Sequence, residues 1–366
     1  MEIYTETPKT GPFDLALRRY FVTAGLAGTD TTAHEDVVQA VINNLRVRKE
    51  KFNYYRDPRA IFTGAYEKVT EKILEVLKDN DRGFKADMWL AALDHRFGQL
   101  YLDALDAFDE AAAYEADGNK VAAAAASNRL PEVWKYAFEA IGAGAPAPRL
   151  LPNATVMQEL LIPLIVHTVH DLPFAVAQVA LAEATGSVHM LGISQPDYQN
   201  LDQIRRAGND VRIFQRHVHD YHRINNLLLD RNEDKFHLVD KVQEAVEAYN
   251  PLLKALDRLM KNYDELLTYQ SLQLIRGMVW HDTTRLLEAT SALEFEEISG
   301  IIVEKTKSYI REIYEPRSAF RQQLILLSRL ISGLTRKWPE ATSTPGIKPA
   351  TSSAGKNESP TRQIVV

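Results

Sequence analysis

The 366-residue sequence contains no cysteine. A disulfide framework, a thiolate nucleophile, a thiolate-ligated zinc site and an iron–sulfur cluster are therefore excluded. A chain without cysteine needs no oxidising environment to fold, so the cytoplasm is the simplest compartment for it. We expect a cytoplasmic protein.

Long apolar runs and basic stretches are also scarce. The longest aliphatic runs, such as Leu160–Val166, are far too short to cross a bilayer. Met1–Asp14 has neither the basic start nor the apolar core of a signal peptide, so we expect no membrane span. The net charge is −6 and no basic stripe is interleaved with aromatic residues, which argues against nucleic acid as a partner.

The usual signatures of cofactor and metal sites are missing. There is no phosphate loop, no dinucleotide-binding glycine fingerprint and no Gly-x-Ser-x-Gly elbow. The ten histidines form neither the Glu-x-x-His pairs of di-iron bundles nor a His-Glu-x-x-His motif. Asp103 and Asp106 have the spacing of a diphosphate-binding motif but belong to a run of ordinary surface carboxylates. We expect no cofactor, no metal and no conventional terpene-ionising activity.

The composition, 45% hydrophobic and 25% charged, is that of a globular protein with a substantial core. Apolar residues recur at helical spacing, whereas strand-like alternation is scarce, which predicts an all-α fold. We expect a single large helical bundle over residues 1–337. Residues 338–366 contain few large apolar side chains and are predicted to be a disordered tail.

The predicted helices follow from apolar periodicity, capping residues and turn signals. They are residues 13–24, 31–51, 59–78, 84–115, 130–141, 153–186, 195–229, 235–290 with a break at Pro251, 293–313 and 317–337. Val121–Ala126 is prone to helix but offers no chemistry, and we interpret it as a solvent-facing helix or linker.

The stretch Asn153–Gly186 is apolar almost throughout but carries polar residues in its middle. Spacings of three or four residues place five side chains on one helix face: Leu160, Leu164, His167, Asp171 and Phe174. Pro163 and Pro173 each remove an amide donor, which predicts a kink or break near His170. A carboxylate four residues after a histidine can fix its tautomer and raise its basicity. His167 and Asp171 are therefore either a general acid–base unit or a structural pair that fastens two helices.

Two other histidine segments have weaker patterns. His217, His219, Asp220, Tyr221 and His222 approach the density of a metal site but match no standard ligand spacing. A partly solvated helix face is the simpler interpretation of this segment. Trp280-His281-Asp282 is typical of an interfacial aromatic residue with exposed polar neighbours.

Several stretches between about residues 55 and 290 resemble an uncharacterised, largely bacterial all-helical family. They are FTGAYEKVT at Phe62–Thr70, HRFGQLYLDAL at His95–Leu105, HTVHDLPFAVAQ at His167–Gln178 and DYHRINNLL at Asp220–Leu228. The family pattern is His-x-x-x-Asp-Leu, which His167, Asp171 and Leu172 carry here. The resemblance implies a helical fold and favours this site, but it implies no particular reaction. In the last stretch it favours Asp220, Tyr221 and Asn225 over the histidines.

We therefore expect a cofactor-independent enzyme that acts on a small, largely apolar substrate. A cyclase or pericyclase of terpenoid or polyketide secondary metabolism fits best, because a dry aromatic pocket can hold a flexible substrate in a reactive conformation. The predicted catalytic residues are His167, Asp171 and Tyr101, and the predicted substrate-binding residues are Tyr66, Phe97, Leu164, Phe174, Tyr221 and Asn225. The alternatives are a metal-dependent hydrolase or oxygenase, and a non-catalytic binding or scaffold protein. The sequence does not predict the oligomeric state.

Overall fold

The computed structural model describes residues 31–78, 87–144, 154–185, 211–221, 248–250, 275–314 and 336–339, with isolated positions at 322, 323, 326 and 329. Within these ranges all regular structure is helical and there is no strand. The predicted all-α fold is confirmed. The helix predicted over residues 13–24 lies outside the described residues.

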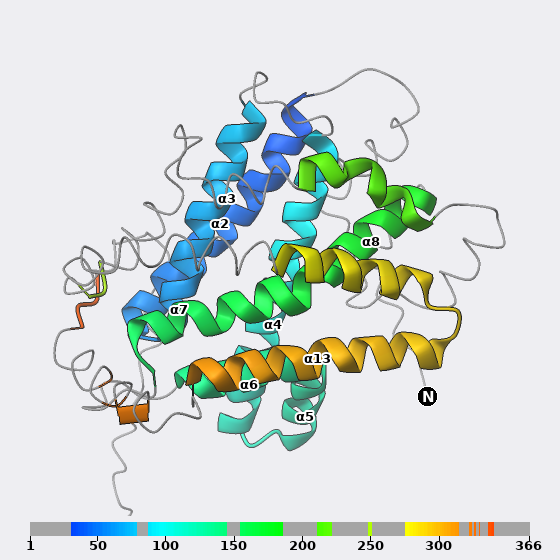
Figure 1. Ribbon diagram of the computed structural model, residues 1–366. Helices are drawn as coiled ribbons and strands as arrows, with labels where there is room; N and C mark the ends of the chain where they lie inside the picture. Colours follow the sequence, from blue (N-terminus) through cyan, green and yellow to red (C-terminus); the bar gives the residue numbers. More distant parts are fainter. Residues whose placement is uncertain are drawn as a thin grey trace, which may run out of the picture.

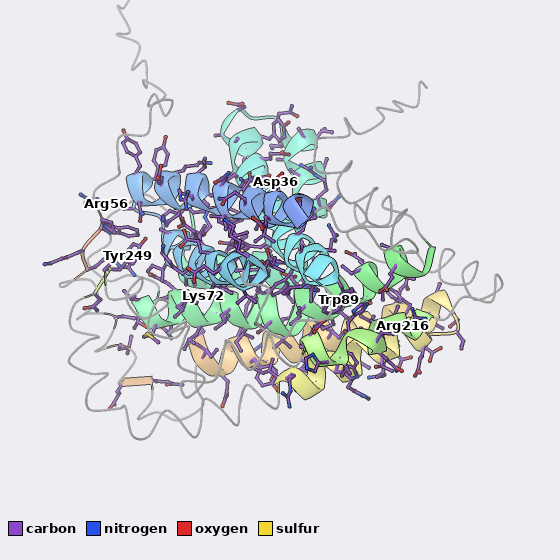
Figure 2. The ribbon with its side chains drawn as sticks, turned by 90° about the horizontal axis from the view of Figure 1, so that it is seen from above. Asp36, Arg56, Lys72, Trp89, Arg216 and Tyr249 are labelled. Carbon is purple, nitrogen blue, oxygen red and sulfur yellow. The ribbon has the colours of Figure 1, made fainter. Side chains whose placement is uncertain are left out.

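Helices α2 (Thr31–Tyr55) and α3 (Arg59–Lys78) lie side by side (Figure 1). The apolar face predicted for α2, which includes Val37 and Leu45, is buried. Arg56 ends α2 with a positive φ of 54°, and the Asp57 amide then donates to the Phe52 carbonyl at 2.8 Å. This left-handed residue caps the helix and turns the chain into α3. In the view of Figure 2, Arg56 and Tyr249 lie on the left, and Trp89 and Arg216 lie right of the centre.

Helix α4 (Asp87–Ala116) packs on α2, on α5 (Lys120–Arg129) and on α8 (Leu172–Thr185). Its first described side chains, Trp89 to Leu93, are all buried, so this end of the helix has no solvent face. Alanines dominate α5, and only Ala123 and Ala126 of this helix are buried. Helix α6 (Glu132–Ile141) starts after Pro131 and ends at Gly142 with a φ of 74°, as its sequence predicts.

The central stretch forms α7 (Val156–Ile165), the π-helical turn η1 (Val166–Asp171) and α8 in direct succession. Thr155 and Gln158 form a capping box at the start of α7. The predicted break near His170 takes the form of a π turn, because the α-helical pattern stops after Ile165 and resumes at Leu172. The Leu172 amide donates five residues back, to the His167 carbonyl. Pro173 supplies no amide and crowds the carbonyl of Val169, and a wider turn accommodates both effects.

The stretch Val156–Glu183 is long and apolar enough to cross a bilayer, but 72% of its most apolar window is buried inside the fold. Helices α3 and α13 (Ala292–Tyr314) pack on α7, and α4, α6 and α13 contact η1. The central position of this stretch, visible in Figure 1, accounts for its apolar composition.

The later part of the chain departs from prediction in two places. Val211–His217 is a 3₁₀ helix rather than the middle of a long α-helix, and residues 336–339 are not helical. Residues 275–288 are helical, as expected. Of the predicted tail, only Trp338 and Pro339 are described; the Trp338 ring packs on Tyr249 at 5.7 Å between centroids.

Candidate functional site

Asp171, at the end of the π turn, accepts three hydrogen bonds. Its Oδ2 accepts from His167 Nδ1 at 2.9 Å and from Trp134 Nε1 at 2.9 Å, and its Oδ1 accepts from His170 Nδ1 at 2.8 Å. The π turn is what presents His167, His170 and Asp171 together, and α6 contributes Trp134. The carboxylate is thus saturated with donors in a buried position.

The protonation states follow from these contacts. Burial by itself would raise the pKa of Asp171, but the hydrogen bonds from His167 and His170 outweigh burial and hold the pKa below its usual value. Burial lowers the pKa of His167 and outweighs the opposing effect of Asp171. An ionised Asp171 accepts only, so His167 carries its proton on Nδ1 and leaves a lone pair on Nε2. His167 is therefore a neutral imidazole with its basic atom directed away from Asp171.

Aromatic rings surround the His167 imidazole, and we call them the aromatic cage. Phe97 stacks on it with 3.5 Å between ring centroids and 8° between planes. Tyr66 meets it edge-on at 4.6 Å. The other rings of the cage lie 5.8 to 6.2 Å away and belong to Phe62, Tyr101 and Trp134. The cage draws on α3, α4 and α6, and it leaves His167 only 1% exposed.

Several polar atoms in this region are buried without a hydrogen-bond partner in the described part of the chain. They are His167 Nε2, the Tyr66 hydroxyl and both carboxyl oxygens of Asp94. Burial raises the pKa of Asp94 to about 8. Burial, and next the Asp94 carboxyl, raise the pKa of Tyr66 well above its usual value. Both groups are therefore protonated at neutral pH and able to donate.

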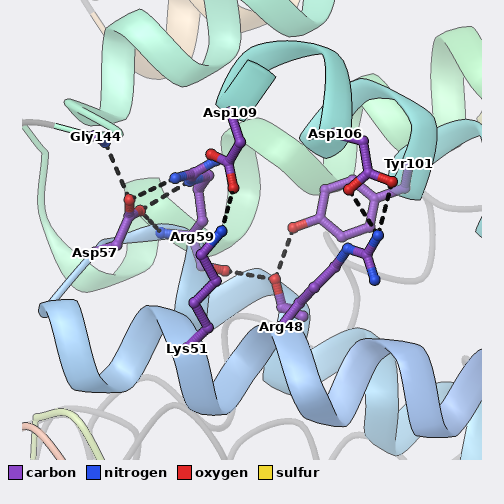
Figure 3. Close-up of polar contacts among 9 residues, drawn as sticks. Arg48, Lys51, Asp57, Arg59, Tyr101, Asp106, Asp109 and Gly144 are labelled. Carbon is purple, nitrogen blue, oxygen red and sulfur yellow. Dashed lines mark hydrogen bonds and ion pairs between the residues drawn. The ribbon is translucent and has the colours of Figure 1, made fainter. Parts of the chain in front are cut away.

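The hydroxyl of Tyr101, which was predicted to be catalytic, has a hydrogen-bond partner within the protein. Its hydroxyl is 2.7 Å from the Thr63 hydroxyl, which in turn donates to the Arg59 carbonyl (Figure 3). The Tyr101 hydroxyl is thus held by α3, although its ring lines the cage. Of the two tyrosines, Tyr66 is the one whose hydroxyl is unpartnered within the described residues.

The neighbouring ion-pair network in Figure 3 is structural. Arg59 donates to both oxygens of Asp57 and to Asp109, and its guanidinium lies 4.3 Å from the Phe52 ring centroid. Asp57 also accepts from the Gly144 amide at 3.1 Å. Every charge in this network is paired, so it joins α2, α3, α4 and the end of α6 and offers nothing to a ligand.

The remaining predicted site residues are dispersed. Phe174 packs on His170 at 5.2 Å rather than on His167, and Leu164 is only partly buried. Tyr221 packs on Trp280 in a separate core cluster around α8. Asn225 lies outside the described residues.

The clustered histidines do not converge. His217 contacts Glu183 at 3.0 Å and stacks on Trp89, and the half-exposed His219 contacts Asp220. His222 lies outside the described residues. No group of three or more His, Asp or Glu side chains with the geometry of a metal site occurs in the part of the chain that the structure describes.

Sequence reasoning missed Trp134 and Asp94. Trp134 lies 37 residues before Asp171 in sequence, so no local pattern could link them. Asp94 did leave a signal: Leu90, Asp94 and Gly98 are four residues apart and share one face of a helix whose neighbouring positions are apolar. A carboxylate within that face is as unusual as the His167–Asp171 pair.

Comparison with known proteins gives a family but no reaction. No curated protein and no solved structure matches the chain. Residues 38–207 and 201–316 match a family described as a family of unknown function, DUF5995. This confirms the resemblance to an uncharacterised family, and the two matched segments cover most of the sequence. The chain belongs to the DUF5995 family.

Proposed function

We propose that this protein is a cofactor-independent enzyme that cyclises a small, largely apolar substrate by acid–base chemistry at His167. The observation that carries the proposal is the state of the His167 ring. Its Nδ1 is fixed by Asp171, while its Nε2 is buried among aromatic rings with no partner in the described residues. An imidazole with one nitrogen held by a carboxylate and the other free is a general base.

A purely structural role accounts less well for this arrangement. A buried polar atom without a hydrogen bond costs about 1–3 kcal/mol. His167 Nε2, the Tyr66 hydroxyl and Asp94 all carry that cost in one region. Polar groups that serve stability alone are normally paired, and departures from that rule concentrate at functional sites. His167 also belongs to a π turn, and π turns within α-helices occur frequently at functional sites.

The aromatic cage favours an apolar substrate. Phe97, Tyr66 and Phe62 offer faces and edges but few hydrogen bonds, so binding would rest on apolar contact. Holding a flexible molecule in a reactive conformation can lower a barrier by about 7–11 kcal/mol. We place such a reaction in secondary metabolism and propose that His167, Asp171 and Leu172 form the family motif.

The test uses the elemental formula of the product. A cyclisation without cofactor conserves the formula, so deleting the gene from its host should remove one metabolite and accumulate another of identical mass. High-resolution mass spectrometry of the two strains measures this directly. Complementation with wild type should restore the product, and complementation with His167→Gln, which can still donate to Asp171, should not. Tyr249→Phe, which removes a buried hydroxyl bonded to Asn53, is the matched control.

The other outcomes are distinct. A mass difference of one water between the paired metabolites would indicate a hydrolase, and a gain of oxygen would indicate an oxygenase. Unchanged metabolites would favour the alternative of a non-catalytic binding or scaffold protein. Restoration of the product by a folded His167→Gln protein would show that His167 takes no part in the reaction as an acid or base.

A further inference from the structure

The unpartnered groups around His167 come from three elements that meet at one place. His167 belongs to η1, Tyr66 to α3 and Asp94 to α4. The Tyr66 ring is 4.6 Å from the His167 ring, and Phe97, three residues after Asp94, stacks on the same imidazole. Asp94 and Tyr66 are 3% and 4% exposed.

Gly98 places the Tyr66 hydroxyl on the face of α4 that carries Asp94. A Cβ added to Gly98 would lie 3.4 Å from the Tyr66 hydroxyl oxygen and 2.8 Å from Val41 Cγ1. The Tyr66 hydroxyl therefore rests against the bare backbone of α4 at Gly98. Asp94 precedes Gly98 by four residues, so it lies one helical turn away on the same face. Side chains on a helix tilt toward its N-terminus and cover the preceding turn. Gly98 has no side chain to cover the surface between itself and Asp94, so that surface is open to Tyr66.

From this arrangement we infer that Tyr66 and Asp94 form a pair of hydrogen-bond donors for the oxygen of a carbonyl-bearing ligand, with His167 Nε2 as the base beside them. The inference rests on the proposed function and adds the substrate class, a ketone or related carbonyl compound with an acidic C–H next to the carbonyl. Donors placed where negative charge develops stabilise that charge strongly in a site without water. A phenol and a neutral carboxylic acid in an apolar site are known to work together in this way.

The electron and proton movements balance without a further reactant. His167 Nε2 takes the proton from the carbon next to the carbonyl, and the C–H electron pair forms the C=C bond of an enolate. The carbonyl π electrons move to oxygen, where Tyr66 and Asp94 donate hydrogen bonds. The enolate carbon then attacks an electrophilic carbon of the same molecule, and the imidazolium returns its proton to the atom that receives the displaced electron pair. The product has the formula of the substrate.

The experiment uses 4-nitrophenol as the probe, because its phenolate oxygen imitates an enolate and its colour reports ionisation. Purified full-length protein is titrated with the probe at a pH below the pKa of the free phenol. Wild type should bind it and develop the phenolate absorbance. Tyr66→Phe and Asp94→Leu should each bind about tenfold more weakly or worse, since a hydrogen bond to a charged oxygen is lost. Tyr249→Phe, the control for a lost buried hydroxyl, should bind as wild type does.

Asp94→Asn separates the donor role from a carboxylate role. An amide is neutral, nearly isosteric and able to donate, so this variant should bind the probe within about threefold of wild type. Affinity as low as in Asp94→Leu would show that Asp94 acts as a carboxylate and would overturn the inference. Equal binding by wild type, Tyr66→Phe and Asp94→Leu, or no binding by wild type, would overturn it as well.

His167→Gln distinguishes this inference from the proposed function. The donor pair does not include His167, so His167→Gln should still bind 4-nitrophenol. If the metabolite comparison shows no pair of equal mass while probe binding still depends on Tyr66 and Asp94, the cyclase proposal fails and the carbonyl-binding pair stands. If the metabolites behave as proposed but substitution of Tyr66 or Asp94 leaves probe binding unchanged, only the inference of the donor pair is wrong.

Discussion

Phe97 lies flat against His167, with 3.5 Å between ring centroids and 8° between their planes. This ring covers one whole face of the imidazole and contributes to the burial that lowers the pKa of His167. Replacing it with a smaller side chain should admit water to that face. Because burial disfavours the charged form of histidine, Phe97→Leu should raise the pKa of His167 toward its ordinary value.

An NMR pH titration of the His167 ring protons measures this shift. Phe295→Leu makes the same change at a buried position in the separate cluster around α8 and should leave the His167 pKa unchanged. A His167 pKa unaffected by Phe97→Leu would mean that the remaining rings of the cage exclude water by themselves.

The titration of Asp94 should be visible in the stability of the protein. Burial raises the pKa of Asp94 from 3.8 to about 8, so the folded protein keeps a proton that the unfolded chain releases. The stability that this proton contributes is complete below pH 3.8 and is lost as the pH rises to about 8. Asp94→Asn does not titrate. Its stability relative to wild type should therefore increase with pH in this window, by about 1.4 kcal/mol per pH unit.

Urea unfolding at several pH values measures the difference. Asp94→Leu, which also cannot titrate, should show the same pH dependence even if its absolute stability differs. A constant difference between wild type and Asp94→Asn from pH 4 to pH 8 would show that Asp94 is ionised in the folded protein. A gain in stability on removal of Asp94 would also fit a residue kept for function at the expense of the fold.

The ion pairs of Arg59 are structural. Their removal should therefore lower the stability of the protein without changing the candidate site. Arg59 is 5% exposed and donates to Asp57 and Asp109. Arg59→Met keeps an unbranched side chain but leaves the buried Asp57 without its cation, which should cost about 3–5 kcal/mol. Arg59→Lys keeps the charge but loses the two-pronged contact and should be intermediate. Thermal unfolding measures both. Nitrophenol binding by the folded fraction should stay as in wild type, and a change would connect this network to the site.

Local patterns were sufficient to predict the contact between His167 and Asp171 but not the residues that surround it. The spacing of His167 and Asp171 is a property of one helix, and the boundaries of α3 follow from Pro58 and the turn signal after Lys78. Which tyrosine hydroxyl has a partner depends on Thr63, whose hydroxyl pairs with Tyr101, whereas Tyr66 is unpartnered within the described residues. That contact joins residues 38 apart in sequence. No periodicity encodes it.

The π turn was missed for a different reason. Pro163 and Pro173 indicate that the helix cannot continue undisturbed, and both a kink and a widened turn relieve the crowding. The choice between them depends on packing around η1, which α4, α6 and α13 all contact. Within the π turn, His167 and His170 both contact the carboxylate of Asp171.

Trp338 packs edge-on against Tyr249, and the Arg336 guanidinium lies 5.2 Å from the Trp338 ring centroid. Arg336 also pairs with the buried Glu159 at the start of α7. Beyond Pro339 the sequence has almost no large apolar side chain until its last three residues, so it has little to bury. Truncation after Pro339 should therefore leave the melting temperature within about 1 °C of the full-length value, because surface changes away from packed residues alter stability by at most about 0.5 kcal/mol.

Truncation after Lys337 should differ from it. It removes the Trp338 ring and uncovers Tyr249 and the Arg336–Glu159 pair. Losing a partly buried aromatic ring costs roughly 1–3 kcal/mol, which is several degrees for a domain of this size. Trp338→Ala in the full-length chain should reproduce that loss, since the ring and not the chain length is responsible. Equal melting temperatures for the two truncations would show that Trp338 contributes nothing and that the packed body ends at Lys337. A large loss on truncation after Pro339 would instead show that residues beyond it stabilise the fold.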